Sequence, residues 1–322
     1  MAIRAFIVGC SSLVLSNEER NFYKDANPWG FILFKRNIDN PEQVRALTAD
    51  MRSCVGRDDA PVLIDQEGGR VQRLGLPHWP KYPSGRELGE LYLQDPIKGR
   101  ELCRLNSLKI AHDLVQLGIN VDCLPVLDVP VKGAHDVIGD RAYSYNAEIV
   151  AVLGRAAAEG LLAGGVLPVI KHIPGHGRAG ADSHQNLPIV TASRKKLESQ
   201  DFLPFKALAD MPAAMSAHVV FTSIDKDAPA TTSRKVIRTV IRGKIGFDGL
   251  LMSDDLSMKA LTGTFRERTE ACFAAGIDIG LHCNGNMDEM RAVAEGTPVL
   301  AGKAKRRAEA ALARIRHRVE PV

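Results

Sequence analysis

The chain has 322 residues, of which 45% are hydrophobic and 25% charged, a balance typical of a globular protein rather than a disordered or fibrous one. The formal net charge is only +4, and much of the excess comes from the segment GKAKRRAEAALARIRHR near the C-terminus. That segment lacks the aromatic residues of a nucleic-acid surface, so we interpret it as a solvated terminal helix.

Six cysteines are scattered without a C-x-x-C pair, which predicts reduced thiols in a cytoplasmic protein and argues against a zinc site made of cysteines. The opening MAIRAFIVGC could pass for a lipoprotein signal. However, the uninterrupted apolar run before Cys10 is only Ala5 to Val8, shorter than the roughly 7 residues a signal needs. We therefore expect a buried first strand. No apolar stretch approaches the roughly 18 residues of a membrane span.

Eight short apolar runs of strand length follow one another, with amphipathic helical stretches between them. They cover residues 5–10, 30–35, 61–66, 119–129, 166–172, 213–221, 249–255 and 276–283. Ser16 and Glu19 form a capping box that starts the first helix, and Asn40 with Pro41 starts the second. Further helices are predicted up to about Gly118, over 147–165 and over 301–318.

The strand-length runs are apolar throughout rather than alternating, as in a parallel sheet that is covered by helices on both faces. Eight such strands separated by helices predict an α/β fold, a (β/α)8 TIM barrel, with residues 1–322 forming a single domain. A doubly wound open sheet is the alternative. It is disfavoured because it usually has fewer strands, and because no G-x-G-x-x-G turn follows the first strand.

Polar residues recur at the C-terminal ends of the predicted strands, where the chemistry of such barrels takes place. A random placement of polar residues would not favour one end of so many strands, so the pattern indicates an enzyme. The residues in question are Asp65, Asp128, Lys171, His172, His218, Asp254, Asp255 and His282.

The segment KHIPGHGRAGADSHQNLP (171–188) gathers three of the nine histidines on a Gly-rich loop. In one interpretation His172, His176 and His184, with a nearby aspartate, bind a divalent ion that activates water. The residue types suit a metal, but the glycines separate the candidates, and a rigid ligand set usually lies on strands or helices. The H-x-H and H-E-x-x-H patterns are also missing.

In the other interpretation the loop carries an acid/base group. Asp182 lies two residues before His184, and a carboxylate beside an imidazole orients the ring and raises its pKa. Such a histidine can give a proton to a leaving group and take one from water near neutral pH. The nucleophile would then be a carboxylate fixed on the barrel, and Asp254 is the best placed, as a two-step glycoside displacement requires.

Four motifs now carry a resemblance to a known family. DQEGGRVQRL (65–74), KHIPGHG (171–177), DSH (182–184) and SDDLSM (253–258) resemble motifs of the family 3 glycoside hydrolases, and most closely those of the bacterial single-domain β-N-acetylhexosaminidases of peptidoglycan recycling. The resemblance extends over nearly the whole chain and agrees with the TIM barrel. It departs at position 173, where the family often has Phe and this chain has Ile.

The resemblance implies a role for each matching residue. Asp254 would be the nucleophile, His184 the acid/base and Asp182 the partner of His184. Asp255 would be structural, and Glu67 is interpreted as a buried structural contact. The expected substrate-binding residues are Asp65, Arg73, Arg141, Lys171 and His172.

The resemblance thus implies a retaining exo-β-N-acetylglucosaminidase without a metal or other cofactor. Its expected substrates are cell-wall fragments in which GlcNAc is β-1,4-linked to 1,6-anhydro-N-acetylmuramic acid. We expect a cytoplasmic monomer that binds neither nucleic acid nor membrane. Two alternatives stay open: a metal-dependent barrel hydrolase that uses the His172/His176/His184 loop, and a non-catalytic sugar-binding protein on the same fold.

Overall fold

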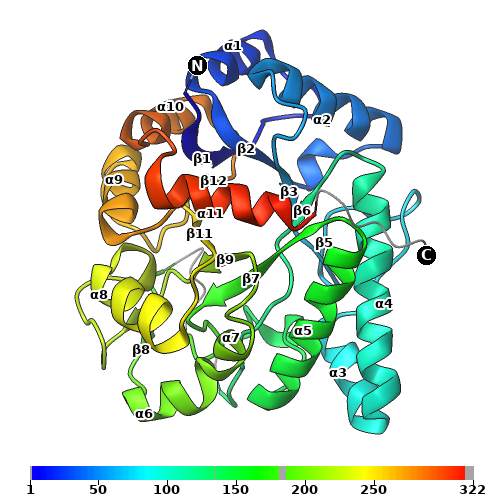
Figure 1. Ribbon diagram of the computed structural model, residues 1–322, viewed down its shortest axis with the longest axis vertical. Coiled ribbons are helices and arrows are strands. Elements are labelled where there is room, and N and C mark those ends of the chain that lie inside the picture. Colours follow the sequence, from blue (N-terminus) through cyan, green and yellow to red (C-terminus); the bar gives the residue numbers. More distant parts are fainter. Residues whose placement is uncertain (1, 134, 181–185, 316–322) are drawn as a thin grey trace.

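The computed structural model describes residues 2–133, 135–180 and 186–315. Eight parallel strands close into a barrel in the order β1-β12-β11-β9-β7-β6-β3-β2, surrounded by helices (Figure 1). The predicted single-domain (β/α)8 barrel is therefore confirmed. The barrel strands are β1 (Arg4–Val8), β2 (Pro28–Leu33), β3 (Val62–Ile64), β6 (Val121–Asp122), β7 (Leu167–Ile173), β9 (Ala213–Ser216), β11 (Leu250–Asp255) and β12 (Ile279–His282).

Several of the predicted strands are shorter than expected, and two of them depart from a single regular strand. The fourth run is a regular strand only in β6, because Pro125 has no N–H to give to a ladder. The chain beyond it still follows β7, where Leu127 N donates to Lys171 O over 2.7 Å. The sixth run divides: β9 stays in the barrel, and β10 (Val220–Phe221) leaves it to pair with β8 (Ile189–Val190).

The helices begin where local signals predict them. Ser16 and Glu19 make both bonds of the capping box, and Asn40 accepts from Gln43 N at the second helix. The final helix ends earlier than predicted within the described residues. The helices are α1 (Asn17–Ala26), α2 (Pro41–Val55), α3 (Gly85–Gln94), α4 (Pro96–Val115), α5 (Ala147–Ala163), α6 (Arg194–Lys196), α7 (Leu203–Ala207), α8 (Arg234–Val236), α9 (Phe265–Ala275), α10 (Met287–Gly296) and α11 (Gly302–Ala313).

Irregular turns of helix supplement these elements. Leu197–Asp201 and Ile237–Ile245 continue α6 and α8 with π-type hydrogen bonds, and three short 3₁₀ turns cover Lys35–Asn37, Gly139–Arg141 and Ala230–Thr232. No helix in the described ranges is long and apolar enough to cross a membrane.

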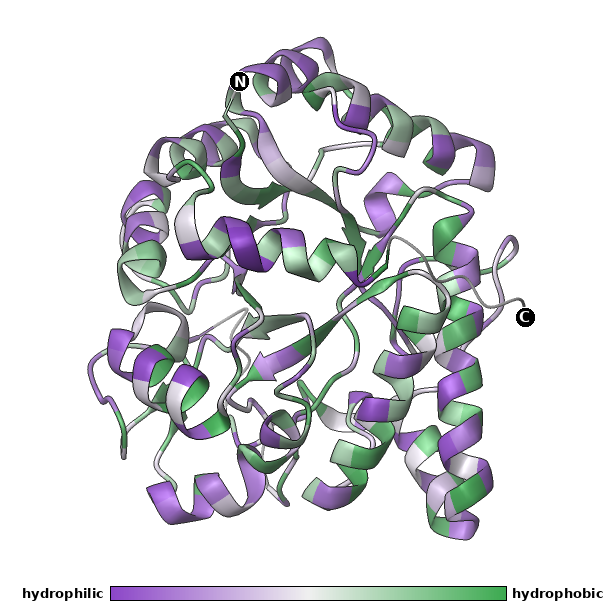
Figure 2. Cartoon of the chain, in the orientation of Figure 1, coloured by the Kyte–Doolittle hydropathy of each residue, from purple (hydrophilic) through white to green (hydrophobic). Residues whose placement is uncertain are grey.

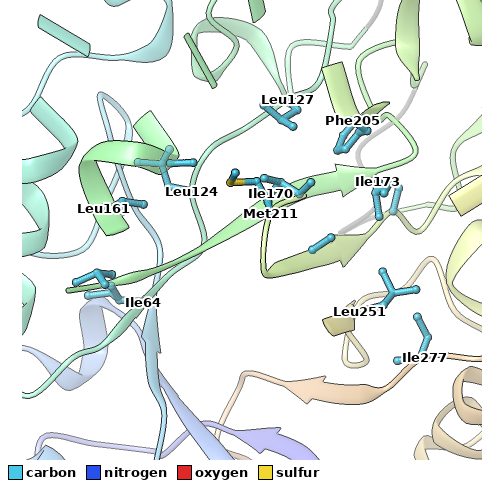
Figure 3. Close-up of a cluster of buried hydrophobic side chains, with 14 of the residues drawn as sticks. Ile64, Leu124, Leu127, Leu161, Ile170, Ile173, Phe205, Met211, Leu251 and Ile277 are labelled. Atoms are coloured by element: carbon cyan, nitrogen blue, oxygen red, sulfur yellow. The ribbon is translucent and has the colours of Figure 1, made fainter. Parts of the chain in front are cut away.

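Both faces of the barrel strands are buried, which explains why their sequences do not alternate. In β1, Ala5 and Ile7 belong to the cluster inside the barrel, whereas Phe6 and Val8 belong to the layer between strands and helices. Figure 3 shows part of that outer layer, to which Ile170 of β7, Leu161 of α5 and Phe205 of α7 all belong. The outer helices are more hydrophilic than the strands (Figure 2).

The N-terminal end of the barrel is covered by α11. The helix crosses in front of the strands in Figure 1, and Ala308 and Ala311 pack into the cluster inside the barrel. Arg307 contacts Asp248, which precedes β11, and Asp278, which precedes β12. The basic terminal segment is therefore partly a structural plug, and the C-terminal ends of the strands are left for a binding site.

A hairpin that the sequence did not reveal follows β3. Strands β4 (Gln66–Gly68) and β5 (Val71–Gln72) pair antiparallel within the first of the motifs identified above. The turn needs Gly68 and Gly69, because both have positive φ, at 89° and 57°. A Cβ on Gly68 would also lie 2.2 Å from Pro83 O, so this hairpin tolerates no larger residue there.

Candidate active site

A pocket of ≈ 160 Å³ opens at the C-terminal ends of the strands. Six of the eight predicted site residues line it, and they come from β3, the hairpin, the loop after β6, β7 and β11. Asp182 and His184 lie outside the described residues. The six are Asp65, Arg73, Arg141, Lys171, His172 and Asp254.

Hydrogen bonds to Asp122 and to the Arg73–Leu74 backbone fix the Asp65–Glu67 segment. Asp122, at the end of β6, accepts from Gln66 N with Oδ1 (3.0 Å). The side-chain oxygen of Gln66 accepts from the backbone N–H of Arg73 and Leu74 at 2.9 and 3.0 Å. Burial raises the pKa of Asp122 well above its ordinary value, which favours the neutral form of a carboxyl that supports the site but does not line the pocket.

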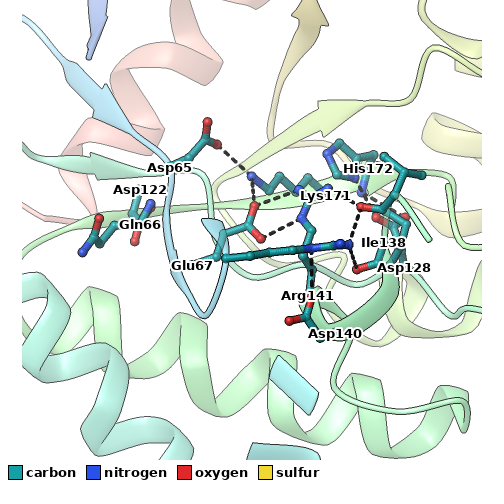
Figure 4. A network of polar contacts seen from close by, with 12 residues as sticks. Asp65, Gln66, Glu67, Asp122, Asp128, Ile138, Asp140, Arg141, Lys171 and His172 are labelled. Carbon is teal, nitrogen blue, oxygen red and sulfur yellow. Dashed lines mark hydrogen bonds and ion pairs between the residues drawn. The ribbon is translucent and has the colours of Figure 1, made fainter. Parts of the chain in front are cut away.

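The floor of the pocket is a chain of ion pairs (Figure 4). Lys171 Nζ lies 2.9 Å from Asp65 Oδ1 and 2.6 Å from Glu67 Oε1. Arg141 donates two hydrogen bonds to the carboxylate of Glu67, at 2.9 and 2.8 Å. Arg73 Nη2 donates to Asp65 Oδ2 over 2.9 Å. Glu67 is thus the buried structural contact that we expected.

These ion pairs fix the charge state of the floor. Burial alone would raise the pKa of Glu67, but Arg141 and Lys171 outweigh burial and hold its pKa at about 2. Asp65 follows the same pattern, because Lys171 and Arg73 keep its pKa below the ordinary range despite burial. Both carboxyls are therefore ionised at neutral pH. Three cations face two carboxylates in this cluster, so it retains one excess positive charge.

His172 is oriented by Asp128. Its Nδ1 lies 2.6 Å from Asp128 Oδ2, and Asp128 Oδ1 accepts from His176 N over 2.6 Å. An Nδ1–H donated to the carboxylate leaves Nε2 of His172 as the ring nitrogen available to a ligand. Asp128 thus positions the ring of His172 and the backbone at His176.

His176 lies beside His172, with ring centroids 5.7 Å apart. Burial, together with the charge that His172 can carry, lowers the pKa of His176 to about 4. The ring is therefore neutral near pH 7 and is a poor proton donor. No group of three or more His, Cys, Asp or Glu side chains with metal-binding geometry occurs in the part of the chain that the structure describes.

Asp254 and Asp255 end β11 but have different surroundings. Asp254 lines the pocket, and its Oδ1 accepts from Asp255 N over 2.8 Å. Asp255 accepts from both the N–H and the hydroxyl of Ser257, at 3.0 and 2.6 Å, and from Cys283 N at 3.1 Å. Its carboxylate is thus used to fasten the turn after β11 to the end of β12, as a structural role requires.

The other two strand-end histidines make hydrogen bonds within the protein, although Nδ1 of His282 has no hydrogen-bond partner among the described residues. His218 bonds to the hydroxyl of Thr231 at 2.8 Å and to Asp255 O at 3.0 Å. His282 Nε2 lies 2.9 Å from Glu289 Oε2. Both are fully buried, and these contacts tie the ends of β9 and β12 to neighbouring segments.

An apolar wall faces the charged floor. Phe34, Met215, Met258 and Leu281 line the same pocket, and the ring of Phe34 lies 5.1 Å from the guanidinium carbons of both Arg36 and Arg73. Sequence reasoning missed these residues, because an apolar residue at a strand end looks like any other core residue. A pocket with one apolar face and convergent ionic groups can bind a small polar ring by its C–H face and its hydroxyls.

The chain is similar to glycoside hydrolases in sequence over most of its length. Residues 8–317 match the glycosyl hydrolase family 3 N-terminal domain. The chain is 38% identical over 288 residues to the β-hexosaminidase of Alkalilimnicola ehrlichii, a match that covers 88% of this chain and 82% of the relative.

Two solved structures are similar over almost the whole chain. The first is NagZ from Neisseria gonorrhoeae in complex with N-trifluoroacetyl-D-glucosamine, with a TM-score of 0.88, 32% identity, and coverage of 97% of this chain and 90% of that one. The second is NagZ of the same organism in complex with a zinc ion, with a TM-score of 0.85, 30% identity, and coverage of 98% of each chain.

Proposed function

The chain belongs to glycosyl hydrolase family 3 and is a β-hexosaminidase, and from this premise we propose that it is a retaining exo-β-N-acetylglucosaminidase. The proposed substrates are GlcNAc-β-1,4-1,6-anhydroMurNAc and its peptide-bearing forms, from which it releases GlcNAc during cell-wall recycling. The proposed place of action is the cytoplasm, an environment that suits the six free cysteines.

The observation that carries the proposal is the position of Asp254. It lies at the end of a rigid strand, on the pocket that also contains the Asp65–Lys171–Glu67 floor. In the proposed first step its carboxylate attacks the anomeric carbon, and the bond to the leaving sugar oxygen breaks. The product is a glycosyl ester of Asp254, and attack by water in the second step restores the original anomeric configuration.

The charge states of the pocket support an acid that is not a carboxylic acid. Most retaining glycosidases protonate the leaving group with a carboxyl of raised pKa. Here the pKa values of Asp65, Glu67 and Asp128 are all lowered by their cationic or histidine partners despite burial, and Asp255 is used by Ser257. Asp65, Glu67 and Asp128 are therefore ionised near pH 7 and hold no proton for a leaving group.

We therefore assign the acid/base role to His184, with Asp182 as the carboxylate that orients it, on the strength of the sequence motif. In the first step the imidazolium gives its proton to the leaving oxygen. In the second step the neutral ring takes a proton from the attacking water. Asp65, Arg73, Arg141, Lys171 and His172 are assigned to the sugar hydroxyls and the acetamido group, since their donors and acceptors converge on the pocket.

Trapping the intermediate tests this proposal. Incubation with 5-fluoro-N-acetylglucosaminyl fluoride is expected to add one fluorosugar to the protein. The electronegative ring fluorine slows both formation and hydrolysis of the ester, whereas the good leaving group speeds formation alone, so the ester accumulates. Mass spectrometry of a digest should find the label on Asp254. A label on another residue, or an inverted product seen by NMR during turnover, would contradict the mechanism.

A metal-dependent hydrolase is kept as a second candidate, because a similar protein has been solved with a zinc ion. We expect dialysis against EDTA to leave the turnover number of this enzyme unchanged, since the proposed steps use only side chains and water. Elemental analysis of the dialysed protein shows whether the chelator removed any metal. A loss of activity that stoichiometric Zn²⁺ restores would favour the metal-dependent candidate.

A further inference from the structure

Two segments that carry site residues are joined by two sets of contacts, one on the pocket floor and one further out. The first segment is the β4/β5 hairpin with its flanks, which supplies Asp65, Glu67 and Arg73. The second is the loop at 136–141, which supplies Ile138 and Arg141. The inner link is the Glu67–Arg141 ion pair on the pocket floor (Figure 4). The outer link is made by Arg70, a residue that belongs to the first motif and has no role in the chemistry described above.

Arg70 lies in the turn of the hairpin and binds the loop with its whole guanidinium. Its Nη2 donates to the carbonyl of Asp136 and also contacts Val137 O at 3.1 Å and Ile138 O at 3.2 Å. Its Nη1 donates to Asp136 Oδ2 over 3.2 Å, and its Nε lies 2.9 Å from Asp140 Oδ1. One side chain thus gathers three successive carbonyls and two carboxylates.

The carbonyl contacts carry more weight than the outermost ion pair. The Asp136 side chain is 84% exposed, and an ion pair to so exposed a carboxylate contributes roughly 0–1 kcal/mol. The three carbonyls precede the short 3₁₀ turn at Gly139–Arg141. Arg70 adds a donor to those that Arg141 gives to Val137 O and Ile138 O, and it is the donor to Asp136 O. The planar guanidinium of Arg70 presents several N–H donors in a fixed arrangement, which the single ammonium group of a lysine does not reproduce.

The backbone of the loop is built to receive this side chain. Gly139 has φ of +47°, and a Cβ on it would lie 2.4 Å from Asp136 Oδ1 and 2.8 Å from Arg70 Nη2. The absence of a side chain at this position lets the guanidinium lie directly against the turn. Two residues further on, Arg141 N donates to Ile138 O over 2.9 Å, so the turn held by Arg70 is the one that sets Arg141.

We propose that Arg70 is a positioning residue for substrate binding, which holds the 136–141 turn so that Ile138 and Arg141 face the pocket. It does not touch the sugar and acts through those two residues. The inference rests on the proposed function in one respect, that the ligand of the pocket is an N-acetylglucosaminide. The order of the turn itself is independent of what the pocket binds.

The test compares Arg70→Met with a matched control, Arg155→Met. Arg155 has a similar side-chain exposure, 34% against 40%, and also pairs with an aspartate and donates to a carbonyl, but it does not line the pocket. Three quantities are measured for each variant: amide hydrogen exchange over residues 136–141, calorimetric binding of GlcNAc, and KM and kcat on a chromogenic β-GlcNAc glycoside.

Arg70→Met is expected to exchange faster over 136–141, to raise KM and the GlcNAc dissociation constant about tenfold, and to change kcat by less than about threefold. Arg70→Lys should fall between wild type and Arg70→Met, Asp136→Ala should stay near wild type, and Arg155→Met should show no change in any of these quantities. If Arg70→Met is unstable, the test rests on Arg70→Lys, for which we expect a smaller rise in hydrogen exchange, KM and the GlcNAc dissociation constant.

Wild-type exchange at 136–141, or wild-type GlcNAc binding and KM, in a folded Arg70 variant would overturn the proposal. So would a fall in kcat with KM unchanged, because that split would place Arg70 in the chemical step. Failure of the proposed function looks different. In that case the wild-type protein itself does not hydrolyse the glycoside. Amide hydrogen exchange over 136–141 and GlcNAc binding by the variants then still test the positioning role of Arg70.

Discussion

Replacing Asp254 with alanine is expected to lower turnover of β-N-acetylglucosaminides by roughly 10⁴-fold or more, the scale seen when a covalent nucleophile is lost. Without the carboxylate no glycosyl ester can form, and water must attack a sugar that is only bound. GlcNAc binding should persist, because the Asp65–Lys171–Glu67 floor does not depend on this side chain. Steady-state kinetics, calorimetry with GlcNAc and thermal unfolding measure the three properties.

Two companion variants sharpen the Asp254 test. Asp254→Asn keeps an oxygen that can accept from Asp255 N, so it should be equally inactive with a smaller effect on stability. Azide added to Asp254→Ala with an activated aryl glycoside should restore some turnover and produce the α-glycosyl azide, since the small anion enters the vacated face. Near-normal hydrolysis by Asp254→Ala would remove this residue from the nucleophile's role.

Replacing His184 with alanine is expected to produce the second large effect, and one that depends on the substrate. General acid catalysis is worth typically 10²–10⁴-fold, and the natural sugar alcohol is a poor leaving group that needs the full benefit. An aryl leaving group such as 2,4-dinitrophenolate needs little protonation. Formation of the glycosyl-enzyme should therefore slow strongly for the disaccharide and only slightly for the dinitrophenyl glycoside.

The leaving-group series is the measurement that isolates this role. A plot of log(kcat/KM) against the pKa of the leaving group should be steeper for His184→Ala than for wild type. Asp182→Asn is expected to show the same trend with a smaller amplitude, because it only removes the carboxylate that orients the ring. Equal slowing of all substrates by His184→Ala would assign His184 to binding or structure instead of proton transfer.

Much of the fold was readable from the sequence because its signals are local. The Ser16/Glu19 capping box and the Asn40–Pro41 helix start involve residues within three positions of each other, so the same contacts form whatever the tertiary context. The eight apolar runs were equally clear, since strands buried on both faces leave an uninterrupted pattern. The hairpin after β3 escaped notice because each of its strands has only two or three residues.

The sequence predicted the charged residues of the candidate site but not its apolar ones. Motif resemblance supplied the six predicted site residues that line the pocket, and four of them, Asp65, Lys171, His172 and Asp254, also lie at the ends of barrel strands. Nothing in the sequence pointed to the apolar wall of Phe34 and Met215, or to Arg70 as the residue that holds the neighbouring turn.

The amino-acid order alone therefore established the barrel, the family and the residue types available for the chemistry, because those follow from periodicity, caps and motifs along the chain. Closure of the barrel decided how the charges are used. It brings Lys171 to Asp65, 106 positions away, and Arg141 to Glu67, 74 positions away. Those contacts lower the pKa values of the two floor carboxyls, and a pKa depends on the distance between charges in space rather than along the sequence.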